Sequence, residues 1–177
     1  MCVIETSPVV ETRRLLLRAP GAQDIGRIAA MANDLDIARM TKRMPHPFGV
    51  RDAEVFVLGV AAQDPARAAT FVIEHEDVGP VGVIGLFEDG DRVPEAGYWI
   101  GREFWGRGLA TEALEGALVW ASRRWKRRAL VAGHFADNPA SGRVLEKAGF
   151  LYTGESRRAF SRARRAETDT RMMVWLA

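Results

Sequence analysis

The stretch Tyr98-Trp-Ile-Gly-Arg-Glu-Phe-Trp-Gly-Arg-Gly-Leu-Ala-Thr-Glu112 decides the fold. Its first residues end a run that predicts a strand over 95–100. Its last residues open the longest predicted helix, over 109–126, in which apolar residues repeat at helical spacing. A strand that passes through a short glycine turn directly into a long helix is typical of an α/β domain.

The turn between this strand and this helix could bind an anion. Gly106 and Gly108 would let the backbone pass close to a ligand, and the helix N-terminus adds a partial positive charge to the full charge of Arg107. These features together indicate a phosphate or pyrophosphate site. A glycine turn that only starts a helix is the plainer interpretation of these residues taken alone. Their spacing fits neither a P-loop nor a dinucleotide fingerprint, so neither ATP nor NAD is expected.

Outward from this stretch, the pattern predicts one α/β domain with the order β-α-α-α-β-β-β-α-β-α-β-β. Strands are predicted over 13–18, 69–75, 81–87, 95–100, 129–136, 150–160 and 168–176. Helices are predicted over 23–32, 34–40, 51–63, 109–126 and 139–148. In the helix over 51–63, the predicted apolar stripe is Val55, Leu58 and Ala62.

Composition limits the class of protein. The 177 residues are 47% hydrophobic and 27% charged, which is typical of a globular chain and not of a disordered one. Without an apolar run of about 18 residues, no membrane span is expected, and the residues at the N-terminus make secretion an unexpected fate. Cys2 is the single cysteine, so a disulfide framework is excluded and the cytoplasm is the expected location. Residues 1–10 are expected to be a flexible N-terminus and 11–177 a single domain.

A second informative segment is Asn138-Pro-Ala-Ser-Gly-Arg-Val-Leu-Glu-Lys-Ala-Gly-Phe150. Asn138 can cap the predicted helix, Pro139 suits its first position, and Gly149 suits the left-handed position after its end. Ser141 is not explained in this way, because a glutamate there would complete a capping box.

The two segments together resemble the GNAT superfamily of N-acetyltransferases. The turn at 105–110 is similar to its pyrophosphate loop, with Trp105 where Gln or Arg is usual, and 138–150 is similar to its second acetyl-CoA-binding motif. The runs 11–18 and 97–100 are similar to the RimJ/RimL-like branch, which includes ribosomal-protein N-terminal acetyltransferases. The resemblance covers residues 11 to 176 and implies a mixed, mostly antiparallel sheet of six to seven strands. Helices would flank this sheet, and a splayed parallel strand pair would lie in its middle.

The resemblance also implies acetyl-CoA as cosubstrate, held between the strands over 95–101 and 129–136. An amide N–H near Trp99 or Ile100 would polarise the thioester oxygen, and Asn138 would hydrogen-bond the pantetheine amides. The residues expected to bind the cosubstrate are Trp99, Ile100, Gly101, Trp105, Gly106, Arg107, Gly108, Leu109, Ala110, Thr111, Asn138 and Ser141.

Two residues are candidates for catalysis. Ser141 would give a proton to the departing thiolate, although many relatives have a tyrosine in that role and a polar serine in a first helical turn is an equal alternative. Glu95 is the candidate base, because it shares a strand face with Gly97 and Trp99. A solvated glutamate at the start of a strand is its alternative.

The expected acceptor is the α-amine of a protein N-terminus. A small amine such as an antibiotic, a polyamine or an amino acid is the first alternative, and a non-catalytic acyl-CoA sensor the second. An RNA-binding module would rest on the arginine runs at 123–128 and 157–165, but it would leave the glycine turn and Asn138 unexplained, so no nucleic acid is expected. The three histidines lack ligand spacing, so no metal is expected. The resemblance allows a homodimer.

Overall fold

The computed structural model describes residues 8–88 and 93–177. Cys2 and most of the expected flexible N-terminus lie outside these ranges. The strands are β1 Val10–Glu11, β2 Leu15–Arg18, β3 Ala68–His75, β4 Gly79–Phe87, β5 Glu95–Ile100, β6 Ala129–Phe135, β7 Leu151–Ser161 and β8 Ala166–Leu176. The helices are α1 Ile25–Ala32, α2 Leu35–Ala38, α3 Val50–Ala61, α4 Leu109–Arg123 and α5 Pro139–Lys147.

One mixed sheet runs through the described part of the chain in the order β1-β2-β3-β4-β5-β6-β8-β7. It has eight strands instead of six to seven, because Val10 and Glu11 add the short strand β1 beside β2. All neighbours are antiparallel except β5 and β6, which are paired only at Glu95–Val131 and Ala96–Ala132. Beyond Ala96 the parallel strands separate, as the expected splayed pair requires.

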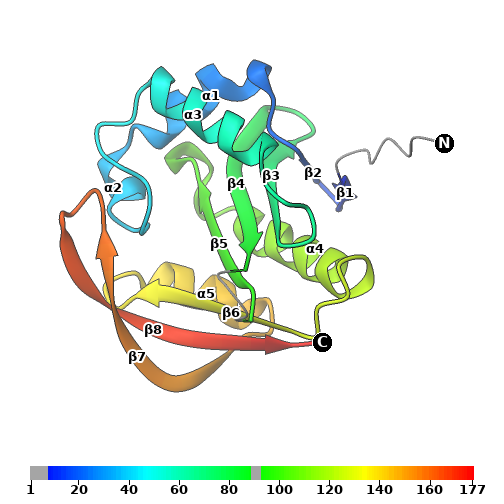
Figure 1. The fold of residues 1–177 in the computed structure, drawn as a ribbon, viewed down its shortest axis with the longest axis vertical. Coiled ribbons are helices and arrows are strands. Elements are labelled where there is room, and N and C mark those ends of the chain that lie inside the picture. The colour runs from blue at the N-terminus through cyan, green and yellow to red at the C-terminus, as the bar shows by residue number, and fades with distance from the viewer. Residues whose placement is uncertain (1–7, 89–92) are drawn as a thin grey trace.

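The helices form two layers (Figure 1). Helix α4 packs on one face of the sheet through Leu114, Ala117 and other buried residues, in a core that also holds Ala96 and Ile100 of β5. Helices α1, α2 and α3 pack together in a second apolar cluster. Trp99 contacts both clusters, so the end of β5 lies where the two layers meet.

The predicted apolar stripe of α3 is wrong. Val55 is 65% and Leu58 70% exposed, whereas Ala53 and Val57 are the buried residues of this helix. Helix α3 packs mainly on α1, and burying the narrow face that carries Ala53 and Val57 is sufficient for this contact. A helix with apolar residues on several sides has more than one possible inner face, and spacing alone cannot choose between them.

No helix in the described residues is both long and apolar enough to span a bilayer.

Candidate active site

The glycine turn before α4 has the backbone of an anion cradle. Gly106 and Gly108 have φ values of +75° and +74°, a left-handed conformation that favours glycine. Along α4, the first N–H group with a hydrogen-bond partner is that of Glu112, which donates to the Gly108 carbonyl at 3.1 Å. The N–H groups of Leu109, Ala110 and Thr111 therefore point out of the helix end, without a partner in the described residues.

Glu112 fixes this turn to the N-terminal strands. Its carboxylate accepts hydrogen bonds from Thr12 Oγ1 at 2.8 Å, the Arg14 amide at 2.7 Å and Arg14 Nε at 2.8 Å. Burial raises the pKa of the Glu112 carboxyl, but these hydrogen bonds outweigh it and hold the pKa below its ordinary value. Arg14 also donates to the Arg107 carbonyl at 3.2 Å. The amides of the cradle are thus held in place from a distant part of the sequence.

The two large side chains of the turn bond to the turn itself. Trp105 Nε1 donates to the Ile100 carbonyl at 2.7 Å, which closes the segment between β5 and α4. Arg107 Nη2 donates to the Glu103 carbonyl at 2.9 Å. Arg107 therefore adds positive charge beside the cradle while part of its guanidinium binds backbone.

The amides of β5 alternate between its two neighbours. Gly101 N–H donates to the Val81 carbonyl of β4 at 2.8 Å. Because hydrogen bonding in an antiparallel pair alternates along the strand, the Trp99 amide also faces β4, while the Tyr98 and Ile100 amides face the gap toward β6. Of the two expected donors to a thioester oxygen, only Ile100 has its N–H on the gap side.

Ser141 lies against Tyr98 across this gap. The Tyr98 hydroxyl lies within hydrogen-bond distance of two Ser141 atoms, Oγ at 3.0 Å, where either oxygen can donate, and the carbonyl oxygen at 3.1 Å. Burial raises the pKa of Tyr98 to about 12. The phenol therefore stays protonated across the ordinary pH range and ties β5 to the first turn of α5.

Asn138 begins α5 as expected. Its side-chain oxygen accepts the Ser141 amide at 3.2 Å, the hydrogen bond of an N-cap. Since that oxygen is engaged, the side-chain NH₂ is the part of Asn138 that remains to meet a ligand.

Glu95 forms an ion pair with Lys42, from the segment between α2 and α3. It lies on the β5 face that looks toward α1–α3, whereas Tyr98 and Ser141 lie on the side of α4 and α5. The two candidate catalytic residues thus lie on opposite faces of β5 and have different partners.

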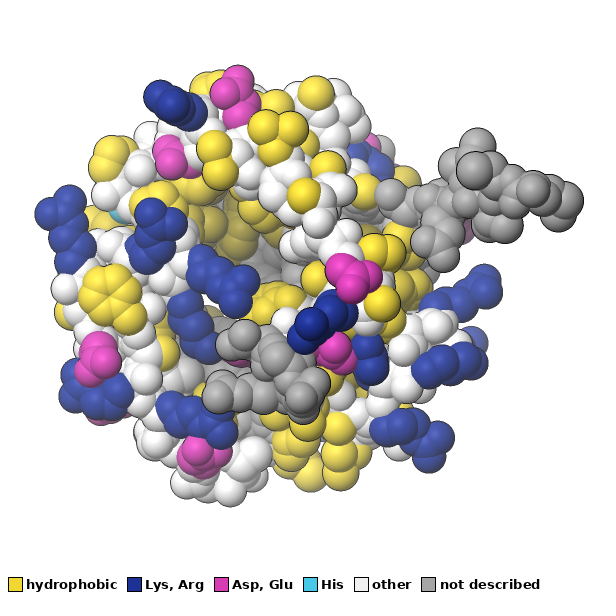
Figure 2. Space-filling model, viewed as in Figure 1, with side chains coloured by type: hydrophobic (Ala, Val, Ile, Leu, Met, Phe, Trp, Pro, Cys, Tyr) yellow, Lys and Arg dark blue, Asp and Glu magenta, His cyan; other side chains and the backbone are white. Residues whose placement is uncertain are grey.

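One cavity of about 1380 Å³ joins the cradle, the Tyr98–Ser141 pair and the Glu95–Lys42 pair, whereas Arg107 and Glu112 do not line it. Its lining includes the cradle residues Gly106, Gly108 and Leu109–Thr111, the helix residues Asn138 and Ser141, and Glu95 with Lys42. Figure 2 shows the molecule hollowed on one face, with Lys and Arg side chains gathered around the hollow. A cavity of this size can hold a long flexible ligand together with a second, smaller one.

The sequence prediction missed Tyr98 and Lys42. Tyr98 could have been found from strand parity, since it shares a face with Ala96 and Ile100, the face that meets the motif helices. Lys42 gave no such signal, because it lies between two helices and reaches Glu95 only through the tertiary fold.

Residues 14–151 match the family model described as the acetyltransferase (GNAT) domain. The uncharacterized N-acetyltransferase YoaA of Bacillus subtilis is 28% identical in an alignment of 158 positions that covers 83% of this chain and 85% of that protein. The structure of Mycobacterium smegmatis RimJ with CoA-disulfide has a TM-score of 0.84 at 22% identity, covering 96% of this chain and 88% of that one. Spermidine N-acetyltransferase from Vibrio cholerae, with CoA and spermine, has a TM-score of 0.76 at 22% identity, covering 92% and 95%.

Proposed function

The chain belongs to the GNAT acetyltransferase family, and on that premise we propose that it moves the acetyl group of acetyl-CoA to the α-amine of a protein N-terminus. The observation that carries the proposal is the row of three free amides, Leu109 to Thr111, at the edge of the large cavity. RimL, a ribosomal L7/L12 α-N-protein acetyltransferase, is among the solved structures with this fold and supports such an acceptor.

The residues present fit coenzyme A. An added Cβ at Gly106 would meet no atom within 4 Å, so its lack of a side chain serves the left-handed turn and leaves the cradle open to a diphosphate. Arg143 and Lys147 of α5 line the same cavity and can meet further phosphate charge. Acetyl-CoA supplies the activated thioester that the acceptor amine attacks.

The Ile100 amide is the donor to the thioester oxygen. It faces the gap, and Trp105 fixes the peptide plane that follows by bonding to the Ile100 carbonyl. A donor held in this way needs no rearrangement when negative charge develops on the oxygen.

The Ser141 hydroxyl donates a hydrogen bond to the departing sulfur, and its oxygen accepts one from the Tyr98 hydroxyl, which orients it. An ordinary thiol has a pKa of about 8.5, so a thiolate binds a proton less strongly than a phenolate whose acid has a pKa of about 12. Complete proton transfer from the Tyr98–Ser141 pair is therefore uphill. The pair acts by hydrogen bonding, while the proton that the amine releases can neutralise the thiolate.

The weak basic machinery favours an α-amine. The Glu95 carboxylate is engaged by Lys42, so it can accept a proton through water only in competition with that ammonium. An α-amine, with a pKa of about 7.7–8.0, is roughly one-tenth neutral at pH 7, whereas a lysine amine is neutral to less than about one part in a thousand. The α-amine is the acceptor that needs the least help.

A small amine is the second candidate, because the Vibrio cholerae enzyme with this fold was solved with spermine. Polyamines are polycations, however, and the described lining of the cavity carries more cations than acids. Charge therefore disfavours a polyamine acceptor here.

An acceptor screen tests the proposal by measuring thiol release from acetyl-CoA, with mass spectrometry of each product. We expect turnover on short peptides with free N-termini and none on the same peptides with blocked N-termini. Turnover on small amines with no reaction on any peptide would reject the protein acceptor. Acetyl-CoA binding without turnover on any amine would instead indicate a sensor.

A further inference from the structure

The cavity has an acceptor end, defined here by residues that line it away from the glycine turn: Arg39 to Arg43, Arg51, Phe87, Glu95 and Arg162. Segment 39–43 follows α2, and Arg162 lies in the turn between β7 and β8. The turn docks on the segment, because Arg162 N–H donates to the Lys42 carbonyl at 3.1 Å and Ser161 Oγ to the Thr41 carbonyl at 3.0 Å. This contact brings Arg43 and Arg162 to the same rim.

The acids that line this part of the cavity are already engaged. Asp36 pairs with Arg102 and Arg39, and Glu95 pairs with Lys42. Asp52 accepts the Gly49 amide at 2.8 Å, in the capping arrangement of α3. Asp36 and Glu95 are thus paired with cations, whereas Asp52 is bonded only to a backbone amide.

Arg43 and Arg162 have no acidic partner among the described residues. The Arg43 guanidinium lies 4.3 Å from the centre of the Phe87 ring, a stacking contact that leaves its N–H edge free. Arg162 reaches only a backbone carbonyl, that of Arg43, at 3.5 Å. Arg51 lines the cavity as well and likewise has no acidic partner in the described ranges.

A rim of this kind fits a negatively charged group. Planar guanidinium groups match the two oxygens of a carboxylate, and each is stabilised when an anion comes between them. The same field repels ammonium ions, which favours an acceptor amine in its neutral, reactive form. The stacking on Phe87 reduces the freedom that Arg43 would lose on binding.

We propose that Arg43 and Arg162 bind a carboxylate of the acceptor, so that the enzyme prefers amines carrying negative charge close to the reacting nitrogen. The inference rests on the proposed function and commits to peptide N-termini with acidic residues directly after the first one. Neutral and basic N-termini lack the group that the two arginines would hold.

The test compares three hexapeptides that start with Ser-Asp-Glu, Ser-Asn-Gln or Ser-Lys-Lys and are otherwise the same. We expect kcat/KM for the acidic peptide to exceed that for its amide counterpart by about tenfold. Raising the ionic strength should reduce this ratio. Equal rates on all three peptides would overturn the inference and leave the proposed function standing, whereas no reaction on any of them would contradict the proposed function itself.

Three variants test whether the preference comes from Arg43 and Arg162. Arg43→Gln with Arg162→Gln should bring the acidic-to-amide ratio close to one. Arg158→Gln should keep it, because Arg158 lies on the same hairpin, outside the cavity lining, and pairs with Glu167. Arg43→Glu should shift the preference toward Ser-Lys-Lys. A double variant with the wild-type ratio would overturn the assignment.

Free aspartate and its amide form a separate arm of the same assay. Faster turnover of aspartate than of the acidic hexapeptide would support carboxylate binding but overturn the commitment to peptides. Slower turnover of aspartate would support that commitment.

Discussion

The Tyr98 hydroxyl joins a buried strand to the helix that carries Ser141, and it has no other bonded partner among the described residues. Tyr98→Phe removes this one contact and keeps the ring in the core. We expect kcat to fall about tenfold, because the Ser141 hydroxyl loses its orientation, and KM for acetyl-CoA to change little. The kcat of Ser141→Ala should fall at least as far, and that of the double variant should fall no further than that of Ser141→Ala. Steady-state thiol release measures both.

The pH profile separates orientation from proton transfer. Burial raises the pKa of Tyr98 to about 12, so the phenol should not limit the rate between pH 8 and pH 10. The rate on a peptide should rise as its α-amine loses its proton near pH 8 and then level off. A fall in rate with an apparent pKa of 9–10 that Tyr98→Phe abolishes would contradict the orienting role.

Helix α5 sits close to the sheet because Gly142 has no side chain. An added Cβ would lie 2.8 Å from the Tyr152 hydroxyl and 2.9 Å from His134 Nε2, two groups bonded to each other at 3.0 Å. Gly142→Ala should therefore push α5 and Ser141 outward. We expect a loss of about 1–3 kcal/mol in the free energy of unfolding, measured in urea, together with a lower kcat.

Gly26→Ala is the matched control for this prediction. Gly26 lies in α1, and an added Cβ there would meet no atom within 4 Å. Alanine should raise the free energy of unfolding by up to about 1 kcal/mol, because it gives the unfolded chain less conformational freedom than glycine does. If Gly142→Ala changed the free energy of unfolding in the same way as Gly26→Ala, the packing of Gly142 against His134 would not be tight.

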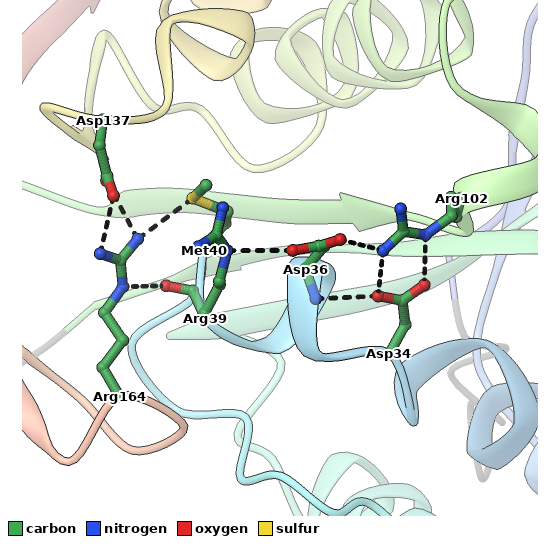
Figure 3. A network of polar contacts seen from close by, with 7 residues as sticks. All are labelled: Asp34, Asp36, Arg39, Met40, Arg102, Asp137 and Arg164. Carbon is green, nitrogen blue, oxygen red and sulfur yellow. Dashed lines mark hydrogen bonds and ion pairs between the residues drawn. The ribbon is translucent and has the colours of Figure 1, made fainter.

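Helix α2 is held at both ends by arginines from other elements (Figure 3). Arg102, just after β5, pairs with Asp34 and Asp36, while Arg164, from the β7–β8 turn, binds the Arg39 carbonyl at 2.6 Å and Asp137. These contacts tie segment 39–43, at the acceptor end of the cavity, to the residues that precede α4 and α5.

Asp34 makes this network sensitive to acid. The side-chain hydrogen bond from Arg102 is the largest cause that lowers the pKa of Asp34, from 3.8 to about 2. A lowered folded-state pKa adds stability that is present above pH 4 and is lost as the pH falls toward 2. Asp34→Asn keeps a residue able to cap α2 at the Asp36 amide, so it removes the charge and the acceptor for Arg102 Nε but leaves the cap.

We therefore expect wild type to be more stable than Asp34→Asn at pH 6 and the difference to vanish near pH 2, in urea unfolding at both values. The difference should be modest, because Arg102 is half exposed and solvent screens the pair. Asp52 accepts the Gly49 amide but has no arginine partner in the described residues. Asp52→Asn should therefore differ less from wild type in stability at pH 6. A gap between wild type and Asp34→Asn that widens toward acid would contradict this sign.

At the scale of the whole molecule, the sheet is two parts joined at a short seam. Strands β1 to β5 meet β6 to β8 only where Glu95 and Ala96 pair with Val131 and Ala132. Both cosubstrate motifs begin beside the opening that this seam leaves, since α4 follows β5 and α5 follows β6. The topology thus brings together two segments that the sequence separates.

The order of the elements and the cradle could be predicted because they depend on local patterns. The glycine turn, the capping role of Asn138 and the bounds of β5 follow from neighbouring residues, and the structure places each where it was expected. The inner face of α3 and the ion pair between Lys42 and Glu95 depend on packing between segments distant in sequence. Periodicity carries no information on such contacts.

Calorimetry with coenzyme A tests most directly whether the amides of Leu109 to Thr111 hold its diphosphate. Wild type should bind coenzyme A at one site, and pantetheine, which lacks the diphosphate, far more weakly. Gly108→Ala should weaken coenzyme A binding about tenfold, because a side chain costs about 1–2 kcal/mol at a φ of +74°. Gly79→Ala, at a φ of +76° in the first residue of β4, should leave it unchanged. Equal affinity for coenzyme A and pantetheine, or wild-type affinity of Gly108→Ala for coenzyme A, would contradict the claim that these amides hold the diphosphate.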